Sequence, residues 1–279
     1  MIALCSNPYR DSGLSRTKEC LRILSEAGYD VCVCPVFIDN EWSAPEGIPV
    51  FRLKDVMTKL SHIIVLGGDG TILAVVRELR GAAVPILGIN LGTKGFMTSL
   101  EPNELERIPE ALTSDVPVSD RMMLDVSLVR NGEIILHDRA LNDVVIHGYG
   151  ECIQPTAWAD GKLVFSFSGD GLVVATPTGS TGYSMSAGGP IVEPDTRAIL
   201  LTPICAHTLS AKPFVLSHLK HVRVLTEKLT GRRANLAVDG YSVADLESGD
   251  LLEINQSSDC VKMIELSGKS FFEQLEKLV

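Results

Sequence analysis

The sequence has 279 residues, enough for one large domain or two of medium size, and its 45% hydrophobic and 22% charged fractions are those of an ordinary globular protein. The formal net charge of −10 and the lack of any Lys/Arg cluster exclude a typical nucleic-acid-binding protein, which offers a basic face. No apolar run reaches the roughly 18 residues that a membrane-spanning helix needs. Residues 1–10 lack the basic and apolar regions of a signal peptide, so a cytoplasmic location is expected.

Cysteine usage favours a reducing compartment. The cysteines are odd in number, irregularly spaced, and contain no CxxC pair that could begin a structural zinc site. Cys32 and Cys34 alternate onto one face of a strand-like segment, where buried free thiols are the ordinary interpretation. We therefore expect free thiols and no metal held by protein side chains. The cysteines are Cys5, Cys20, Cys32, Cys34, Cys152, Cys205 and Cys260.

The first part of the chain alternates between strand-like and helix-like segments. Short apolar or β-rich runs predict strands at residues 2–6, 31–37, 62–66 and 84–89. Helical spacing predicts helices at residues 14–27, 71–80 and 103–112. This alternation predicts parallel strands with helices on both faces of the sheet.

The pattern changes near Pro117. From Met122 onward the β-rich segments are short and separated by turn signals such as Asn131-Gly132 and Asp160-Gly161, which predicts antiparallel strands. Residues 181–188 could open a short helix, and residues 270–278 predict an amphipathic helix with Phe271, Leu275 and Leu278 on one face. The predicted fold is an α/β N-terminal domain with a Rossmann-like parallel sheet (1–116), a mostly antiparallel, β-sandwich-like domain (117–268), and a C-terminal helix (269–279) that packs back on a domain.

The strongest local signal is Gly67-Gly68-Asp69-Gly70-Thr71, between a predicted strand and a predicted helix. That arrangement aims free backbone N–H groups at an anion, and the glycines let a phosphate approach closely. A carboxylate repels phosphate, so Asp69 is expected to face a hydroxyl and accept its proton. The alternative is a sharp turn whose Asp69 caps the helix. The pattern is neither a Walker A loop nor a GxGxxG fingerprint.

Two further clusters lie at predicted turns. A second glycine-rich cluster, residues 90–96, follows the strand at 84–89, at the strand end where ligands bind in open α/β sheets; an ordinary turn is the alternative. Asn142 could read a base edge and Asp143 could accept two vicinal ribose hydroxyls. Equally, both could hydrogen-bond their own backbone.

A fourth cluster begins at Asp170 and continues through residues 176–190, which are rich in hydroxyls and glycines around one aromatic residue, Tyr183. Hydroxyls and free N–H groups suit a polar, uncharged nucleotide pocket, and Tyr183 could stack on a base. A hydroxyl-rich loop that caps a helix is the alternative.

Together and in this order, these motifs resemble the NAD kinase family over residues 66–240. The segment with Pro203, His207 and Pro213 is similar to the family's TPxxxHxLSxRP segment, and Asp239-Gly240 is similar to its late turn. The GGDGT sequence alone is shared with diacylglycerol and sphingosine kinases and, more loosely, with phosphofructokinases. Residues 176–190 with Asn142-Asp143 are far more specific to NAD kinases.

The resemblance implies a role for each matching residue. Asp69 would be the general base. The donor loop, on the triphosphate of ATP with Mg²⁺ bridging its phosphates, would consist of Gly67, Gly68, Gly70 and Thr71. The NAD-binding residues would be Asp69, Gly70, Asn142, Asp143, Asp170, Thr181, Tyr183 and Ser186.

Several positions depart from the family pattern. Asp143 replaces the commoner Glu, which shortens the reach to the ribose by one methylene, and Gly182 stands where Ala is usual. Lys94 stands where Leu is frequent, and Tyr241 stands where many members have Gln. Ser168 stands where some members have Arg, so the choice between NAD and NADH stays open.

The expected reaction transfers a phosphoryl group from ATP, another triphosphate or polyphosphate to the 2′-hydroxyl of the adenosine ribose of NAD, giving NADP. One alternative is a lipid kinase, which should show an apolar or basic membrane-facing patch. The other is a non-catalytic NAD sensor on the same scaffold, which the intact Asp69 disfavours. The resemblance also implies a homo-oligomer, a dimer or tetramer, with NAD and ATP as substrates and neither nucleic acid nor membrane as a partner.

Overall fold

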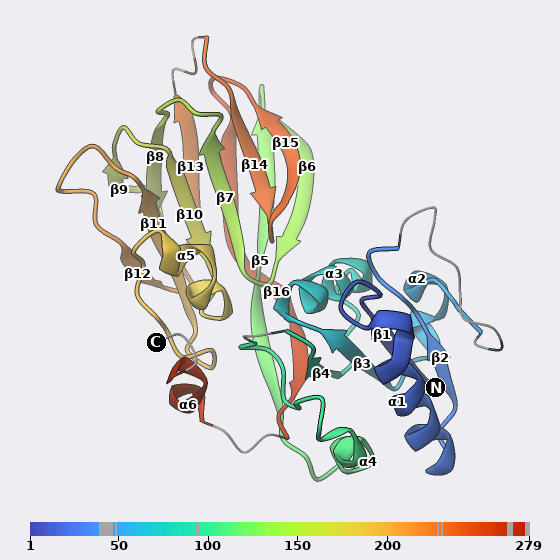
Figure 1. Ribbon diagram of the computed structural model, residues 1–279. Helices are drawn as coiled ribbons and strands as arrows, with labels where there is room; N and C mark the ends of the chain where they lie inside the picture. Colours follow the sequence, from blue (N-terminus) through green and yellow to red (C-terminus); the bar gives the residue numbers. More distant parts are fainter. Residues whose placement is uncertain are drawn as a thin grey trace. The chain divides into compact units, whose positions relative to one another are not determined.

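The computed structural model describes residues 1–38, 47, 49–92, 95–227, 229, 231–266 and 270–276. The chain forms two compact units (Figure 1): Met1–Asp120 with Val261–Val279, and Arg121–Cys260. The first unit takes residues from both ends of the chain because β16 (Leu251–Ile264) contributes to both units. The domain boundaries expected from the sequence, at residues 116 and 268, stay predictions.

The first unit is built on a parallel sheet. Its strand order is β2-β1-β3-β4, and Met263 at the end of β16 pairs in parallel with Ile86 of β4. Nearly every residue of β1, β3 and β4 is buried, as expected for strands covered on both faces. The strands are β1 (Ile2–Ser6), β2 (Val31–Val33), β3 (His62–Gly67) and β4 (Ile86–Asn90).

Helices cover both faces of this sheet. Leu24 of α1 (Ser15–Glu26) and Ile108 of α4 (Ile108–Ala111) share one core cluster with Leu87 of β4. On the opposite face, Ile72 of α3 (Asp69–Leu79) approaches Gly88, the next residue of β4. The shorter elements are η1 (Ser12–Leu14), α2 (Leu53–Val56), η2 (Met57–Lys59) and η3 (Leu105–Arg107).

Two predicted elements of this unit are shorter than expected. Of the strand expected at residues 31–37, only Val31–Val33 form a strand, β2. Phe37 has a left-handed φ of 59°, which is incompatible with strand geometry. The helix expected at residues 103–112 is split into η3 and α4, because Pro109 lies at the start of α4 and cannot donate a backbone hydrogen bond to the preceding turn. The sequence analysis also missed α2 and η2.

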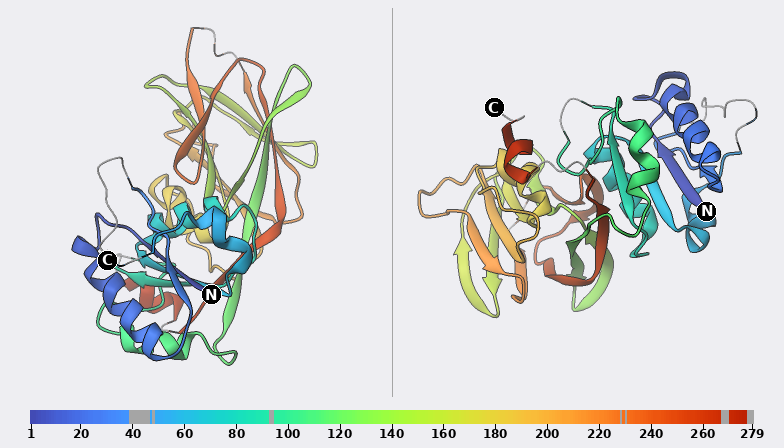
Figure 2. Two further views of the ribbon diagram at one scale, coloured as in Figure 1. Left: turned by 90° about the vertical axis from the view of Figure 1, so that its right-hand side faces the viewer. Right: turned by 90° about the horizontal axis from the view of Figure 1, so that it is seen from below.

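The second unit is an antiparallel β sandwich. One sheet has the order β12-β11-β10-β7-β14-β15, and the other contains β5, β6, β8, β9, β13 and most of β16. The two sheets share one core, to which Leu124 of β5, Val144 of β7 and Leu252 of β16 all contribute, and Figure 2 shows them as two layers. The predicted turns at Asn131-Gly132 and Asp160-Gly161 are present, with positive φ at all four residues.

The remaining elements are β5 (Val118–Arg130), β6 (Glu133–Ala140), β7 (Asp143–Gly148), β8 (Gln154–Ala159), β9 (Lys162–Ser166), β10 (Gly171–Ala175), η4 (Thr178–Thr181), α5 (Tyr183–Ser186), β11 (Ala198–Ile204), β12 (Phe214–Ser217), β13 (Val222–Glu227), β14 (Ala234–Val238), β15 (Tyr241–Leu246) and α6 (Phe271–Leu275). The expectation of uniformly short strands is wrong for β5 and β16, which have 13 and 14 residues.

The predicted fold class is confirmed: a parallel α/β unit, a mostly antiparallel β unit and a C-terminal helix. Ser270 caps α6 by accepting a hydrogen bond from the backbone N–H of Glu273 at 3.2 Å. None of the five described residues of α6 is buried, and Leu278 of the predicted apolar face lies outside the described residues. In the part of the chain that the structure describes, no helix has the length and apolarity needed to cross a membrane.

Candidate active site

The glycine-rich loop joins β3 to α3 at the carboxyl edge of the parallel sheet. A side chain at Gly67 would be 2.2 Å from the hydroxyl oxygen of Thr71, so only glycine fits there. The Thr71 hydroxyl is buried and accepts a hydrogen bond from the backbone N–H of Gly68 at 3.4 Å. The loop therefore turns tightly into the first turn of α3.

Asp69 is the first residue of α3, and its carboxylate is held from outside that helix. One oxygen accepts the backbone N–H of Phe96 at 3.0 Å and the other accepts the backbone N–H of Met97 at 3.1 Å. Gly68, not Asp69, is the N-cap, so the interpretation of Asp69 as a helix cap is not supported. Burial raises the pKa of Asp69, while the two amide hydrogen bonds act in the opposite direction.

A cavity of about 340 Å³ in the first unit lies against this loop. Loops that follow β1, β3 and β4 line it, as expected where the carboxyl ends of neighbouring parallel strands meet. Its lining residues are Asn7, Arg10, Phe37, Gly68, Asp69, Gly70, Thr71 and Gly92.

Arg10 gives this cavity a positive charge, and Asp69 gives it a carboxylate. Within the described part of the chain, the guanidinium of Arg10 has no ion-pair partner. The sequence analysis missed Asn7 and Arg10. Only their position could have revealed them: they follow β1, which pairs with β3, the strand that precedes the glycine-rich loop. Thr93 and Lys94 of the second glycine-rich cluster lie outside the described residues.

Asn142 and Asp143 lie where β7 begins in the second unit. The backbone N–H groups of Asn142 and Asp143 both donate to the carboxylate of Asp239, at 2.7 and 3.1 Å. The carbonyl oxygen of Asn142 accepts the backbone N–H of Thr176 at 2.9 Å. Neighbouring turns thus satisfy the backbone of the pair, which leaves its side chains for other contacts.

Two buried oxygen atoms lie in and beside this segment without a hydrogen-bond partner in the described part of the chain. Among the described residues, the side-chain oxygen of Asn142 and the hydroxyl of Thr178 are buried and accept or donate no hydrogen bond. Buried polar groups ordinarily find a partner, so both atoms have unused hydrogen-bonding capacity in this structure, as does the hydroxyl of Ser6 in the first unit. Gly179 packs directly on this segment, because a Cβ there would be 2.1 Å from the carbonyl oxygen of Asn142.

Asp143 is buried, and its pKa is raised to about 7, first by burial and then by the negative charge of Asp239. Tyr183, the first residue of α5, is 39% exposed, and its hydroxyl pKa is raised by burial and by the nearby groups of Cys205, Asp170 and Asp143. Tyr183 therefore interacts with both carboxylates, although the two are apart: Asp143 pairs with Ala175 at one end of β10, and Asp170 precedes Gly171 at the other end.

The other predicted residues of this unit lie on the same segment. The hydroxyl of Thr181 donates to the carbonyl oxygen of Thr178 at 3.3 Å, which closes η4, and Ser186 ends α5 with an exposed side chain. The expected short helix at residues 181–188 is thus a 3₁₀ turn followed by a four-residue α-helix. The predicted donor-loop residues belong to the first unit, and the predicted adenosine-site residues belong to the second.

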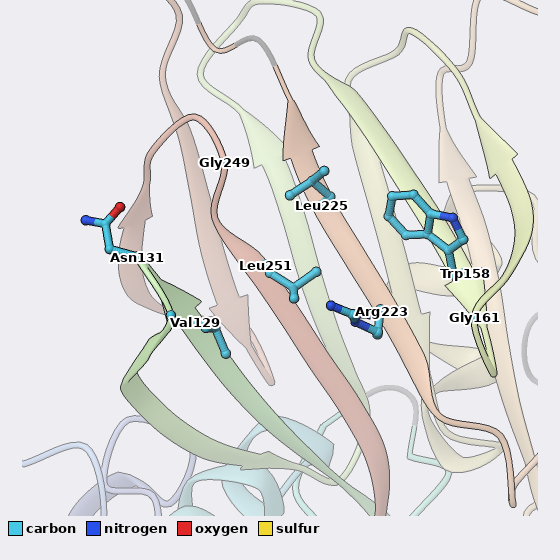
Figure 3. Close-up of a pocket in the computed structure, with 9 residues that line it drawn as sticks. Val129, Asn131, Trp158, Gly161, Arg223, Leu225, Gly249 and Leu251 are labelled. Carbon is cyan, nitrogen blue, oxygen red and sulfur yellow. The ribbon is translucent and has the colours of Figure 1, made fainter.

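A larger hollow, about 530 Å³, lies elsewhere on the second unit (Figure 3). Trp158 of β8, Leu225 of β13 and Leu251 of β16 line it, and Arg223 beside them pairs with Glu253 at 3.6 Å. It contains no predicted site residue and no carboxylate among its lining residues. Its size therefore does not make it the active site.

These features define the class of the protein: a kinase with an α/β unit and a β-sandwich unit. The family follows from comparison with known proteins. The family model of the ATP-NAD kinase N-terminal domain matches residues 2–115, and that of the ATP-NAD kinase C-terminal domain matches residues 141–266. The chain therefore belongs to the NAD kinase family, as its motifs predicted.

Relatives and solved structures agree with this assignment. An NAD kinase of Ruminiclostridium cellulolyticum is 35% identical over 289 residues, covering 100% of this chain and 97% of that protein. An NAD kinase of Citrifermentans bemidjiense is 41% identical over 76% of this chain and 75% of its own. A yeast NADH kinase complexed with NADH is 26% identical with a TM-score of 0.85, over 99% of this chain and 85% of that one. An Archaeoglobus fulgidus NAD kinase in complex with ATP is 26% identical with a TM-score of 0.76, over 100% and 98%.

Proposed function

We propose that this enzyme phosphorylates the 2′-hydroxyl of the adenosine ribose of NAD, giving NADP. The observation that carries the proposal is the Asn142-Asp143 pair, whose backbone is anchored by Asp239 and Thr176. An adenosine offers vicinal hydroxyls for the Asp143 carboxylate. The solved yeast relative is complexed with NADH, so NADH is the second acceptor to test.

Asp69 is the proposed general base. The 2′-oxygen attacks the γ-phosphorus, the bond from that phosphorus to the bridging oxygen of the donor breaks, and the hydroxyl proton passes to Asp69. The two amide hydrogen bonds to Asp69 fix its carboxylate and use only one acceptor position on each oxygen. Each oxygen therefore keeps a lone pair for the substrate hydroxyl.

ATP is the proposed donor, since the solved archaeal relative is in complex with ATP. Its phosphates would lie on the Gly68–Gly70 backbone in the 340 Å³ cavity, with Arg10 supplying positive charge. The described residues form no cluster of three side chains suited to a metal ion, and Mg²⁺ often binds through substrate phosphates. When bound there, Mg²⁺ neutralises charge on the phosphates.

A homo-oligomer and a cytoplasmic location complete the proposal. The oligomer is supported by family resemblance. The location is supported by the cysteines, all seven of which are free thiols, with Cys5, Cys20, Cys32 and Cys34 buried.

The test of the proposed function is direct. Purified protein is incubated with ATP, Mg²⁺ and either NAD or NADH, and the product is measured with an NADP-specific dehydrogenase, after enzymatic oxidation in the NADH arm. We expect NADP to form only when both substrates are present. Asp143→Ala should raise the KM for NAD by about ten- to a hundredfold, the loss of a charge-assisted hydrogen bond, with little change for ATP. Tight NAD binding without product would instead identify a sensor.

A further inference from the structure

Asp239 occupies the tight turn between β14 and β15 and has a buried carboxylate. Its φ is +48° and that of Gly240 is +81°, so the turn holds two left-handed residues in succession. Aspartate tolerates this conformation better than most residues do. The turn directs the carboxylate to the point where β7 begins.

One carboxylate holds three successive backbone amides. Asp239 accepts hydrogen bonds from the N–H groups of Leu141 at 2.8 Å, Asn142 at 2.7 Å and Asp143 at 3.1 Å. In return, the N–H of Asp239 donates to the carbonyl oxygen of Asp143 at 3.0 Å. Hydrogen bonds to an ionised acceptor are roughly twice as strong as neutral ones, so this contact fixes the segment firmly.

No strand ladder could replace this contact for Asn142. The pairing of β7 with β10 begins at Asp143, and its pairing with β14 begins at Val144. The other backbone contacts of the segment come from Thr176, whose hydroxyl donates to the carbonyl oxygen of Leu141 at 2.6 Å. The Asn142 amide therefore depends on Asp239 alone among the described residues.

We propose that Asp239 is a positioning residue for the acceptor nucleotide: by holding the backbone of residues 141–143, it sets the direction of the Asn142 and Asp143 side chains. The inference rests on the proposed function, because it gives that pair the role of holding the ribose of NAD. Asp239 itself touches no substrate in this scheme. Because Asp239 already fixes the loop, the loop loses less conformational entropy when NAD binds.

The carboxylate does more here than an amide could. An asparagine at position 239 keeps the left-handed turn and offers one oxygen, but its NH₂ group would face a backbone N–H that also donates. Asp239→Asn therefore removes part of the anchor without removing the turn.

The chain contains a matched control for this substitution. Asp160 also begins an Asp-Gly turn, with the same φ of +48°, and its exposed carboxylate accepts from Lys220 at 2.6 Å and from the backbone of His221 at 3.0 Å. Asp160→Asn makes the same chemical change in the same kind of turn, away from the candidate site. Any general effect of an amide in such a turn appears in both variants.

The experiment compares steady-state kinetics of wild type, Asp239→Asn and Asp160→Asn. We expect Asp239→Asn to raise the KM for NAD roughly tenfold, the loss of one buried hydrogen bond, and to leave the KM for ATP within about twofold. Asp160→Asn should change neither. An unchanged KM for NAD in a folded Asp239→Asn protein overturns the proposal. So does an equal rise in both KM values, since that is a general loss of structure.

A double-mutant cycle separates the inference from the proposed function. If Asp239 acts through the Asn142-Asp143 segment, Asp239→Asn should raise the KM for NAD much less in an Asp143→Ala background than in wild type. Fully additive effects contradict the inference. If Asp143→Ala alone leaves the KM for NAD unchanged, the assignment of the ribose site fails instead.

Amide hydrogen exchange on the wild-type protein tests the contact even if the variant does not fold. We expect the Asn142 amide to be protected to the same extent as the strand amides of β7, because the Asp239 carboxylate holds it. Exchange as rapid as that of the Asn131 amide, which lies in an exposed turn, rules out a firm anchor.

Discussion

The backbone N–H of Asp239 donates to the carbonyl oxygen of Asp143 at 3.0 Å, so two buried acidic residues lie side by side where β7 begins. Burial and the charge of Asp239 raise the pKa of Asp143 to about 7 from 3.8. Tyr183 of α5 is another titratable group that interacts with Asp143. The backbone contact therefore stabilises the loop, while the two side chains repel each other when both are ionised.

This repulsion predicts how Asp143→Asn changes stability with pH. The folded protein holds the Asp143 proton more tightly than the unfolded chain does, so this stabilisation is complete below pH 3.8 and is lost as pH rises to about 7. Asparagine resembles the protonated acid at every pH. The gain in melting temperature from Asp143→Asn should therefore grow between pH 5 and 7 and level off above about pH 7.5. Asp160→Asn is the control, and its effect should be flat over that range because the pKa of Asp160 is lowered by Lys220. A constant difference for Asp143→Asn would mean that Asp143 has an ordinary pKa.

Asp69→Asn should remove most turnover while both substrates still bind. A single well-placed base contributes about 10²–10⁴-fold to kcat. Wild-type kcat should rise with pH as Asp69 loses its proton. Because burial raises the pKa of Asp69, this rise should occur at a higher pH than for an ordinary carboxyl group. Steady-state kinetics give kcat and both KM values, and thermal melting reports the fold. The structure adds a competing explanation, since Asp69 also holds the backbone of Phe96 and Met97. A raised KM for either substrate with a nearly normal kcat would favour that anchoring role over the role of a base.

The sequence was sufficient for the fold class because its periodicity follows burial directly. The apolar runs at β1, β3 and β4 are buried on both faces, and the Asn-Gly and Asp-Gly turns of the second unit adopt the positive φ values that such pairs favour. Local pattern was a weaker guide to where strands end. Pro35, which cannot donate to a strand ladder, was the one signal that β2 would end near Val33, and the prediction of a strand to residue 37 passed over it. By contrast, β16 runs for 14 residues because it pairs with strands distant in sequence.

The candidate site was predictable where chemistry and spacing coincide, and not where a contact spans the chain. Asp69 and Asp143 lie in short motifs. Arg10 lies 59 positions before Asp69 and reaches the same cavity only because β1 pairs with β3. Asp239 was noticed only as part of a turn, because its three amide contacts join residues separated by 96 to 98 positions. Such a contact leaves no local periodic signal.

Arg10→Ala should weaken donor binding selectively. Arg10 is the cation among the residues that line the 340 Å³ cavity, and it has no ion-pair partner in the described part of the chain. A guanidinium can bind a phosphate with two parallel hydrogen bonds, so its removal should raise the KM for ATP about tenfold or more and leave the KM for NAD nearly unchanged. Arg10→Lys should recover part of the loss. Arg22→Ala, which removes the same charge from an exposed ion pair with Glu26, is the control. If Arg10→Ala and Arg22→Ala have equal effects, Arg10 acts only through the net charge of the protein and does not bind the phosphates directly.

The last prediction concerns two glycines three positions apart in the segment that packs on Asn142. A Cβ at position 179 would be 2.1 Å from the carbonyl oxygen of Asn142 and 2.5 Å from its carbonyl carbon. Both are backbone atoms of a residue held by Thr176 and Asp239, so neither can move aside cheaply. A Cβ at position 182 would find its nearest neighbour, the carbonyl oxygen of Gly179, at 3.3 Å, and the next at 3.6 Å. That contact needs a shift of only a few tenths of an ångström, and alanine is usual there in the family that the motifs resemble.

Gly179→Ala should therefore destabilise the protein by about 1–3 kcal/mol, as overpacking of a tight site does, and should raise the KM for NAD by displacing Asn142. Gly182→Ala should leave the melting temperature and both KM values close to those of wild type. Thermal melting and steady-state kinetics on the two variants give the comparison, and each serves as the other's control because both add one methyl group. If Gly179→Ala lowers stability while the KM for NAD stays unchanged, the backbone of Asn142 can move without disturbing NAD, and the segment is not part of its binding site. A Cβ at position 182 would also lie 3.8 Å from the carboxylate of Asp143. If Gly182→Ala alone raises the KM for NAD, the nucleotide lies closer to residue 182 than to residue 179.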